Sequence, residues 1–175
     1  MAARFQFYQS NGTSPGTDSA QGTGAGSNDW DFKRVDLPGP ISGVATEGIY
    51  AGGFSMQVYL RGRFDQPTDG SSAFSSISNV KFYASSLDLT GCGTGAYILA
   101  SGTPTYTQPA ATSKSGTWSP IPTVAASGIL IGTAALTAGT AGLTDWVGLQ
   151  LKTNVSGASA GYSAYSSFTV VYDEI

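Results

Sequence analysis

Histidine is absent from this chain, and cysteine occurs once, at position 92. Without histidine the sequence cannot form a Ser-His-Asp triad, a Cys-His pair or a zinc site with histidine ligands. A single cysteine also excludes an internal disulfide. Cys92 lies between Gly91 and Gly93 without a cationic neighbour that would activate its thiol, so we interpret it as a small buried residue. Most hydrolase mechanisms are therefore excluded.

Charge is also scarce. Lys, Arg, Asp and Glu make up 11% of the residues, against about 25% in a typical soluble domain. The formal net charge is −3, and the cations gather only at Lys33-Arg34 and at Arg61 with Arg63. Because this distribution provides no basic face for a phosphate backbone, we expect no nucleic-acid partner. A lightly charged surface resists self-association poorly, so we expect part of the exterior to be buried in an assembly.

Membrane and export signals are also missing. The chain begins Met1-Ala2-Ala3-Arg4-Phe5 without an apolar leader, which predicts synthesis in a cytosol. Residues 124–143 carry no charge and are long enough to span a bilayer. Glycines and threonines interrupt this run, however, so we expect a buried strand at Ile129–Ile131 and no membrane partner.

What the sequence does contain is a series of short alternating runs. From Phe54 to Phe64 apolar residues occupy even positions, and from Ile77 to Ala84 the alternation predicts that Val80, Phe82 and Ala84 face inward. Two further runs, 145–152 and 166–173, flank a loop of small residues and predict a hairpin in which Val147, Leu149 and Leu151 belong to the core. The polar alternates of these two runs, Gln150, Lys152 and Asp173, would then be available for contacts. Pro104, Pro109, Pro120 and Pro122 predict edges and loops between residues 101 and 122.

These strands predict an all-β fold, a single antiparallel β-sandwich of jelly-roll or immunoglobulin-like type with an extended N-terminal arm. We place the arm at residues 1–29 and the sandwich at 30–175. The tract Gln9 to Asn28 is polar and rich in glycine, so it is not expected to order by itself. Phe5, Phe7 and Tyr8 near its start would contact a neighbouring subunit.

Catalytic and metal sites have only weak candidates. Asp65 with Asp69, or Asp29 with Asp31, could supply paired carboxylates or bind calcium, but turn and capping roles explain these aspartates equally well. We therefore predict no enzymatic activity, no metal and no cofactor. Trp30, Trp118 and Trp146 could stack against sugars.

Four blocks of the sequence resemble a known group of proteins. They are Gly52 to Phe64, Ile77 to Tyr83, Asp145 to Leu151, and Tyr172-Asp173-Glu174. In pattern and order these blocks resemble small β-rich virion proteins of tailed bacteriophages, of the capsid decoration, or cement, type. The resemblance implies a sandwich fold, a homo-oligomer with a trimer favoured, and the major capsid protein as partner. It places the protein on the outer capsid surface of the virion after synthesis in the host cytoplasm.

The expected function is therefore structural. The protein would bind the outer surface of an assembled capsid and stabilise it by bridging major capsid subunits, because a ligand of the assembled lattice shifts the equilibrium toward that lattice. The alternative is a carbohydrate-binding or receptor-binding module of a tail fibre or baseplate. The residues expected to contact partners are Phe5, Phe7, Tyr8, Trp30, Arg61, Arg63, Asp173 and Glu174.

Overall fold

The computed structural model describes residues 3–13, 16–20, 30–65, 74–90, 93–99, 105–109, 118–132, 142–153 and 166–175. Their strands are β1 Arg4–Asn11, β2 Thr17–Ala20, β3 Val58–Asp65, β4 Ile77–Ser86, β5 Gly93–Leu99, β6 Trp118–Pro120, β7 Ile129–Gly132, β8 Val147–Thr153 and β9 Ser167–Glu174. Helical structure in these residues is limited to α1 Val44–Glu47 and the 3-10 turn η1 Ala125–Ser127.

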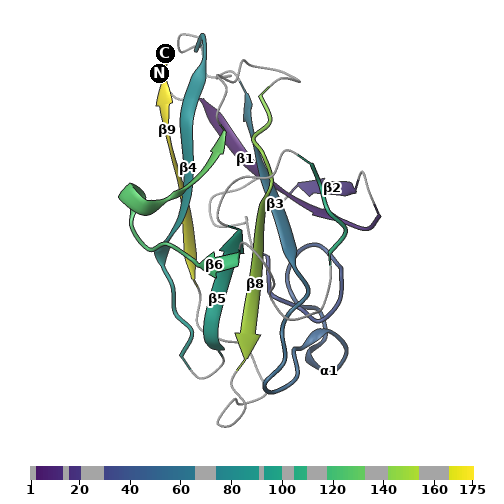
Figure 1. Ribbon diagram of the computed structural model, residues 1–175. Coiled ribbons are helices and arrows are strands. Elements are labelled where there is room, and N and C mark those ends of the chain that lie inside the picture. Colours follow the sequence, from purple (N-terminus) through teal and green to yellow (C-terminus); the bar gives the residue numbers. More distant parts are fainter. Residues whose placement is uncertain are drawn as a thin grey trace.

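Two antiparallel sheets form the molecule, which confirms the predicted all-β sandwich (Figure 1). The larger sheet has the strand order β2-β1-β3-β8-β5-β6, and the smaller has the order β7-β4-β9. Every pair of hydrogen-bonded strands in the described residues is antiparallel. One continuous apolar cluster lies between the two sheets and draws residues from both.

The core follows the predicted alternation in β3 and β4. Leu60 and Phe64 are 0% exposed, as are Phe82 and Ala84. Aromatic rings join the two sheets across the core: Phe7 of β1 meets Phe82 of β4 edge-on with ring centroids 6.0 Å apart, and Phe64 of β3 meets Tyr172 of β9 edge-on at 4.8 Å. Such pairs add to the free energy gained by burying apolar area.

A bulge in β4 corrects the phase of that strand. Ile77 is fully buried together with Val80, although a flat strand would point these two side chains to opposite faces. The pairing of β4 with β9 shifts between Ser78 and Lys81, and Asn79 has a φ of 53°. Asparagine tolerates this left-handed conformation, so the bulge returns Ile77 to the inner face.

The start of the chain differs from the predicted arm. Residues Arg4–Asn11 form β1, which pairs along its length with β3 and, at its far end, with β2. Phe7 is buried in the core, and the ring of Phe5 packs beside Phe64 at 4.9 Å. The short apolar alternation is enough to place this strand in the chain's own sheet, so a boundary at residue 29 does not describe residues 4–20. Residues 21–29 lie outside the described part of the chain.

The predicted hairpin at the end of the chain is wrong, although both of its strands exist. β8 pairs with β3 and β5 in the larger sheet, whereas β9 pairs with β4 in the smaller one. Val147, Leu149 and Leu151 are core residues, as predicted. Gln150 was expected to be available for contacts, but it is 0% exposed and its Nε2 donates to the Ser55 carbonyl oxygen at 3.0 Å.

The predictions for the proline-containing segment and for the uncharged run also agree with the structure. β6 is an edge strand that contains Pro120, and β7 covers the predicted strand at residues 129–131. Among the described residues, no helix is long and apolar enough to cross a membrane.

Candidate interaction surface

Three of the predicted contact residues meet on the outer face of the larger sheet. Tyr8 on β1 lies directly opposite Arg61 on β3, and Arg63 lies two residues further along that strand. Arg61 forms an ion pair with Asp18 of β2, and its guanidinium lies 4.5 Å from the centre of the Trp146 ring. The alternation of β3 places Arg61 and Arg63 on one face, as predicted. Arg61, however, contacts Asp18 and Trp146 of its own chain.

An aromatic and polar layer, the outer-face cluster, covers this side of the sheet. The Tyr106 ring lies 5.5 Å from Tyr59 and 6.1 Å from Trp146. Its hydroxyl donates to the Gly12 carbonyl oxygen at 3.1 Å, and Trp146 Nε1 donates to Ser10 Oγ at 2.9 Å. Burial, followed by the nearby negative charges, raises the pKa of Tyr106 above its ordinary value. Its phenol therefore stays protonated and acts as a hydrogen-bond donor.

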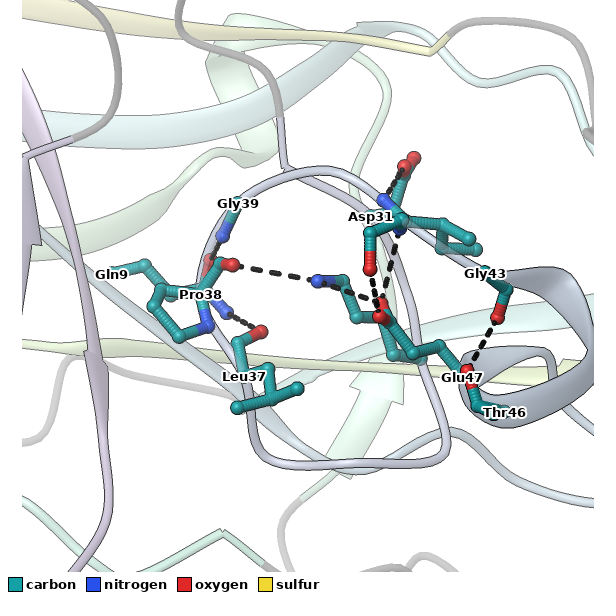
Figure 2. Close-up of polar contacts among 11 residues, drawn as sticks. Gln9, Asp31, Leu37, Pro38, Gly39, Gly43, Thr46 and Glu47 are labelled. Atoms are coloured by element: carbon teal, nitrogen blue, oxygen red, sulfur yellow. Dashed lines mark hydrogen bonds and ion pairs between the residues drawn. The ribbon is translucent and has the colours of Figure 1, made fainter.

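The second surface is the anchored loop, residues 30–57, which precedes β3 and contains little regular structure apart from α1. It is held by a buried ion pair: Lys33 Nζ lies 3.1 Å from a Glu47 carboxylate oxygen, and their side chains are only 3% and 7% exposed. Figure 2 shows Glu47 among the surrounding polar contacts of the loop. Ser42 also donates to Glu47, and this bond, together with Lys33, lowers the pKa of the Glu47 carboxyl.

Hydrogen bonds between side chains and backbone groups also hold the loop in place. The Gln9 side chain accepts a hydrogen bond from the Gly39 amide at 2.9 Å and approaches the Leu37 carbonyl oxygen at 3.5 Å (Figure 2). An Asp31 carboxylate oxygen accepts from the Ile41 amide at 2.7 Å.

Two main-chain bonds hold the Lys33 region from either side. The Arg34 amide donates to the Glu47 carbonyl oxygen at 2.8 Å, and the Met56 amide donates to the Lys33 carbonyl oxygen at 2.7 Å. A buried charge is costly unless it is paired, so Lys33 and Glu47 favour this one arrangement of the loop over others.

The anchored loop also touches the outer-face cluster. Asp36 accepts a hydrogen bond from the Gly12 amide at 2.6 Å, at the turn after β1. Burial raises the pKa of the Asp36 carboxyl, although this hydrogen bond opposes the change. The charge of Asp36 also acts on Tyr106. The anchored loop and the outer-face cluster therefore meet at Gly12, which donates to Asp36 and accepts from Tyr106.

An exposed tyrosine projects from the anchored loop. Tyr50 is 69% exposed, yet its hydroxyl oxygen accepts a hydrogen bond from Arg34 Nη1 at 2.6 Å, and the guanidinium lies 4.8 Å from its ring centre. Leu37 on the same loop is 50% exposed. Tyrosine and arginine are enriched among residues that dominate binding energy at interfaces. A tyrosine held by its arginine loses little freedom on binding.

The remaining predicted contact residues lie elsewhere. Phe7 is buried in the core, and Phe5 and Trp30 pack against it, with the Trp30 ring 5.1 Å from Phe168. Because Phe5 and Phe7 pack into the core of their own chain, these two side chains leave little surface for contact with a neighbouring subunit. At the other end of the chain, Asp173 accepts from Asn79 at 3.1 Å, and Glu174 accepts from the Ala3 amide at 3.1 Å.

The residues considered for sugar or metal chemistry are not gathered into one site. Trp118 is 8% exposed on β6, and Arg61 covers one face of Trp146, so the three tryptophans do not form a shared stacking surface. Asp65 lies 2.8 Å from Arg63 as an ion pair. Asp29, Asp69 and Cys92 lie outside the described residues. Within the described ranges, no group of three or more Cys, Asp and Glu residues is arranged to hold a metal ion.

Sequence reasoning missed the main residues of the anchored loop. Glu47 is the only charged residue between Asp36 and Arg61, which is a usable signal, because an isolated charge in an uncharged run must be either solvated or paired. Its partner Lys33 could not be identified from spacing. Tyr50 carries no signal of its own in a chain with nine tyrosines.

Comparison of the chain with protein-family models, with curated proteins and with solved structures gives no match. What the protein does must therefore be inferred from its own surfaces.

Proposed function

We propose that this chain is a structural virion protein that binds the outer surface of a tailed-bacteriophage capsid. It stabilises the shell by bridging neighbouring major capsid subunits. The phage assignment follows from the sequence resemblance of residues 52–174. The binding role draws its support from the anchored loop.

The observation that carries the binding role is the exposed Tyr50 stacked with Arg34. The Tyr50 side chain is 69% exposed, and its hydrogen bond from Arg34 fixes its orientation before binding. The buried Lys33–Glu47 pair fixes the segment beneath it. A rigid loop that presents an aromatic group is suited to docking on a preformed surface such as an assembled lattice.

The charge distribution is also consistent with this role. The ion pairs of Lys33 with Glu47, Arg61 with Asp18 and Arg63 with Asp65 neutralise six charged residues within the chain. A surface with few free charges contributes little long-range steering, so specificity would come from shape and from the exposed apolar groups.

The proposal is tested by heating virions that carry this protein and virions prepared without it. A ligand that binds only the assembled lattice must raise the temperature at which the shell disrupts. The expected result is a higher disruption temperature when the protein is present, with the protein recovered on the shell. An unchanged disruption temperature together with no protein on the shell would reject the proposal.

A further inference from the structure

The four edge strands of the two sheets are not alike. An open strand edge invites pairing with another chain, and proteins commonly shorten or interrupt such edges. β2 and β7 have four residues each, and β6 has three and contains Pro120. β9 has eight residues, Ser167–Glu174, with no proline, lysine or arginine. Among the edge strands of the described residues, only β9 therefore has the length and composition to pair with a further strand.

β9 is also the least completely covered of the long strands. Phe168, Val170 and Tyr172 face the core, but each is only half-buried, whereas the inward residues of the neighbouring β4 are 0% exposed. Within the described residues, β4 is the only strand that pairs with β9. In Figure 1, β9 lies in yellow at the margin of the molecule with β4 beside it. In the described part of the chain, the sandwich is thus open along this edge.

The sequence of β9 is nearly symmetric in residue type about Val170. Moving outward from that position, Thr169 and Val171 are both β-branched, and Phe168 and Tyr172 are both aromatic. An antiparallel pairing of two identical strands about a two-fold axis at Val170 would place Phe168 of one copy opposite Tyr172 of the other. Aromatic and β-branched cross-strand pairs of this kind stabilise sheets.

We propose that β9 pairs with β9 of a second copy of this chain, antiparallel and with the two-fold axis at Val170. The two smaller sheets would then form one continuous sheet, β7-β4-β9 followed by the same strands of the second copy in reverse order. The interface is isologous, because the same surface of each copy contributes to it. The half-buried inner side chains of β9 would become covered.

Charge favours this register and orientation. Asp173 of one copy would face Ser167 of the other, and Glu174 would face Ser166, so no carboxylates oppose one another. In a parallel pairing the acidic residues at the end of β9 would meet their own counterparts, which is unfavourable. A second copy of the chain therefore fits this edge in the antiparallel orientation only.

This inference does not depend on the proposed attachment to a capsid, because it concerns the free protein. It also predicts a dimer, whereas the sequence resemblance implies a trimer. Failure of one proposal therefore leaves the other open to its own test.

A matched pair of double variants tests the pairing. Thr169 and Val171 lie on the outer face of β9, opposite Tyr83 and Lys81 of β4, so their replacement leaves the core intact. In the proposed dimer, Thr169 of each copy faces Val171 of the other. Thr169→Glu with Val171→Glu would oppose two carboxylates at each crossing, whereas Thr169→Lys with Val171→Glu would oppose a cation and a carboxylate.

Sedimentation equilibrium should give twice the mass of the chain for the parent protein and for the Lys/Glu variant. The Glu/Glu variant should lose the dimer and give the mass of a single chain. The two variants differ only at position 169. Circular dichroism of both variants checks that each is folded, so that loss of the dimer is not confused with unfolding. A parent protein that is monomeric or trimeric, or two variants with the same mass, would overturn the proposal.

A disulfide test checks the position of the axis. In a Cys92→Ser background, Val170→Cys should form a covalent dimer on mild oxidation, because residue 170 faces its own counterpart. Thr169→Cys should not, since its counterpart lies on a diagonal, about 7–8 Å away and beyond the usual disulfide geometry. Cross-linking through residue 169 but not through residue 170 would refute the two-fold register.

Discussion

Gly62 provides the sharpest test of the position of β1. This glycine lies on β3 opposite Phe7, and a methyl group added to it would lie 2.2 Å from Cε2 and 2.5 Å from Cζ of the Phe5 ring. Both distances are far below van der Waals contact, so the Phe5 ring must shift and disturb its packing on Phe7 and Phe64, whose ring centres lie 4.7 and 4.9 Å away. Overpacking of this kind costs about 1–3 kcal/mol. We therefore expect Gly62→Ala to lower the free energy of unfolding by that amount.

Urea unfolding of four proteins measures this effect: the parent, Gly62→Ala, Phe5→Ala and the double variant. Once the Phe5 ring is removed, the added methyl group has space. The double variant should therefore lose about 0.5–3 kcal/mol less unfolding free energy than the sum of the two single variants. Gly132→Ala is the control, because at that buried strand position the nearest atom, Cγ2 of Val80, would be 3.5 Å away. The close approach of Phe5 to Gly62 would be refuted if the losses of unfolding free energy from Gly62→Ala and Phe5→Ala were additive, or if Gly132→Ala lost as much as Gly62→Ala. Either result would mean that Phe5 does not pack on β3 of its own chain.

Two further predictions concern the core and the anchored loop. Phe82→Ala removes a fully buried ring that contacts both Phe7 and Phe168, so chemical unfolding should show a loss of about 3–5 kcal/mol. For Glu47, the lowered pKa means that its stabilising effect is present above the ordinary glutamate pKa and is lost as the pH falls through the lowered value. The stability difference between the parent and Glu47→Gln should therefore narrow on acidification; a difference that is constant with pH would contradict the role of the ion pair.

The strands themselves were predictable because one period, two residues, decides which side chains face the core. Leu60, Phe82 and Leu149 are buried where the alternation places them. The pattern gives the face of a strand but not its neighbour. β8 and β9 are consecutive in the chain, yet they belong to different sheets, and only contacts between distant residues determine that choice.

The burial of Gln150 shows a second limit. Alternation alone predicts that a polar residue between Leu149 and Leu151 faces water. β8 lies inside the six-stranded sheet, and Gln150 is fully buried on the side opposite those two leucines, with its amide bonded to Ser55. Tyr106, which packs on Tyr59 and Trp146 on the outer face, comes from a segment between prolines that the sequence identified only as edges and loops. Where such a segment packs is not encoded in its local pattern.

The candidate interaction surface was the least predictable part. Tyr8, Arg61 and Arg63 could be assigned to one face because β1 and β3 alternate regularly. The anchored loop, in contrast, depends on Lys33 and Glu47 meeting across an irregular segment. The alternation of apolar and polar residues cannot predict this ion pair, because the pair forms where two buried charges must neutralise each other.

The most direct test of the proposed role is the binding of Tyr50→Ala to capsid shells that lack this protein, compared with the parent and with Val124→Ala. Val124 is 56% exposed next to η1 and serves as the control for loss of an exposed side chain. If Tyr50 is a main contact, its truncation should cost about 2 kcal/mol or more, roughly thirtyfold in affinity, while Val124→Ala binds as the parent does. Equal binding by all three proteins, or no binding by the parent, would contradict the proposed docking through the anchored loop.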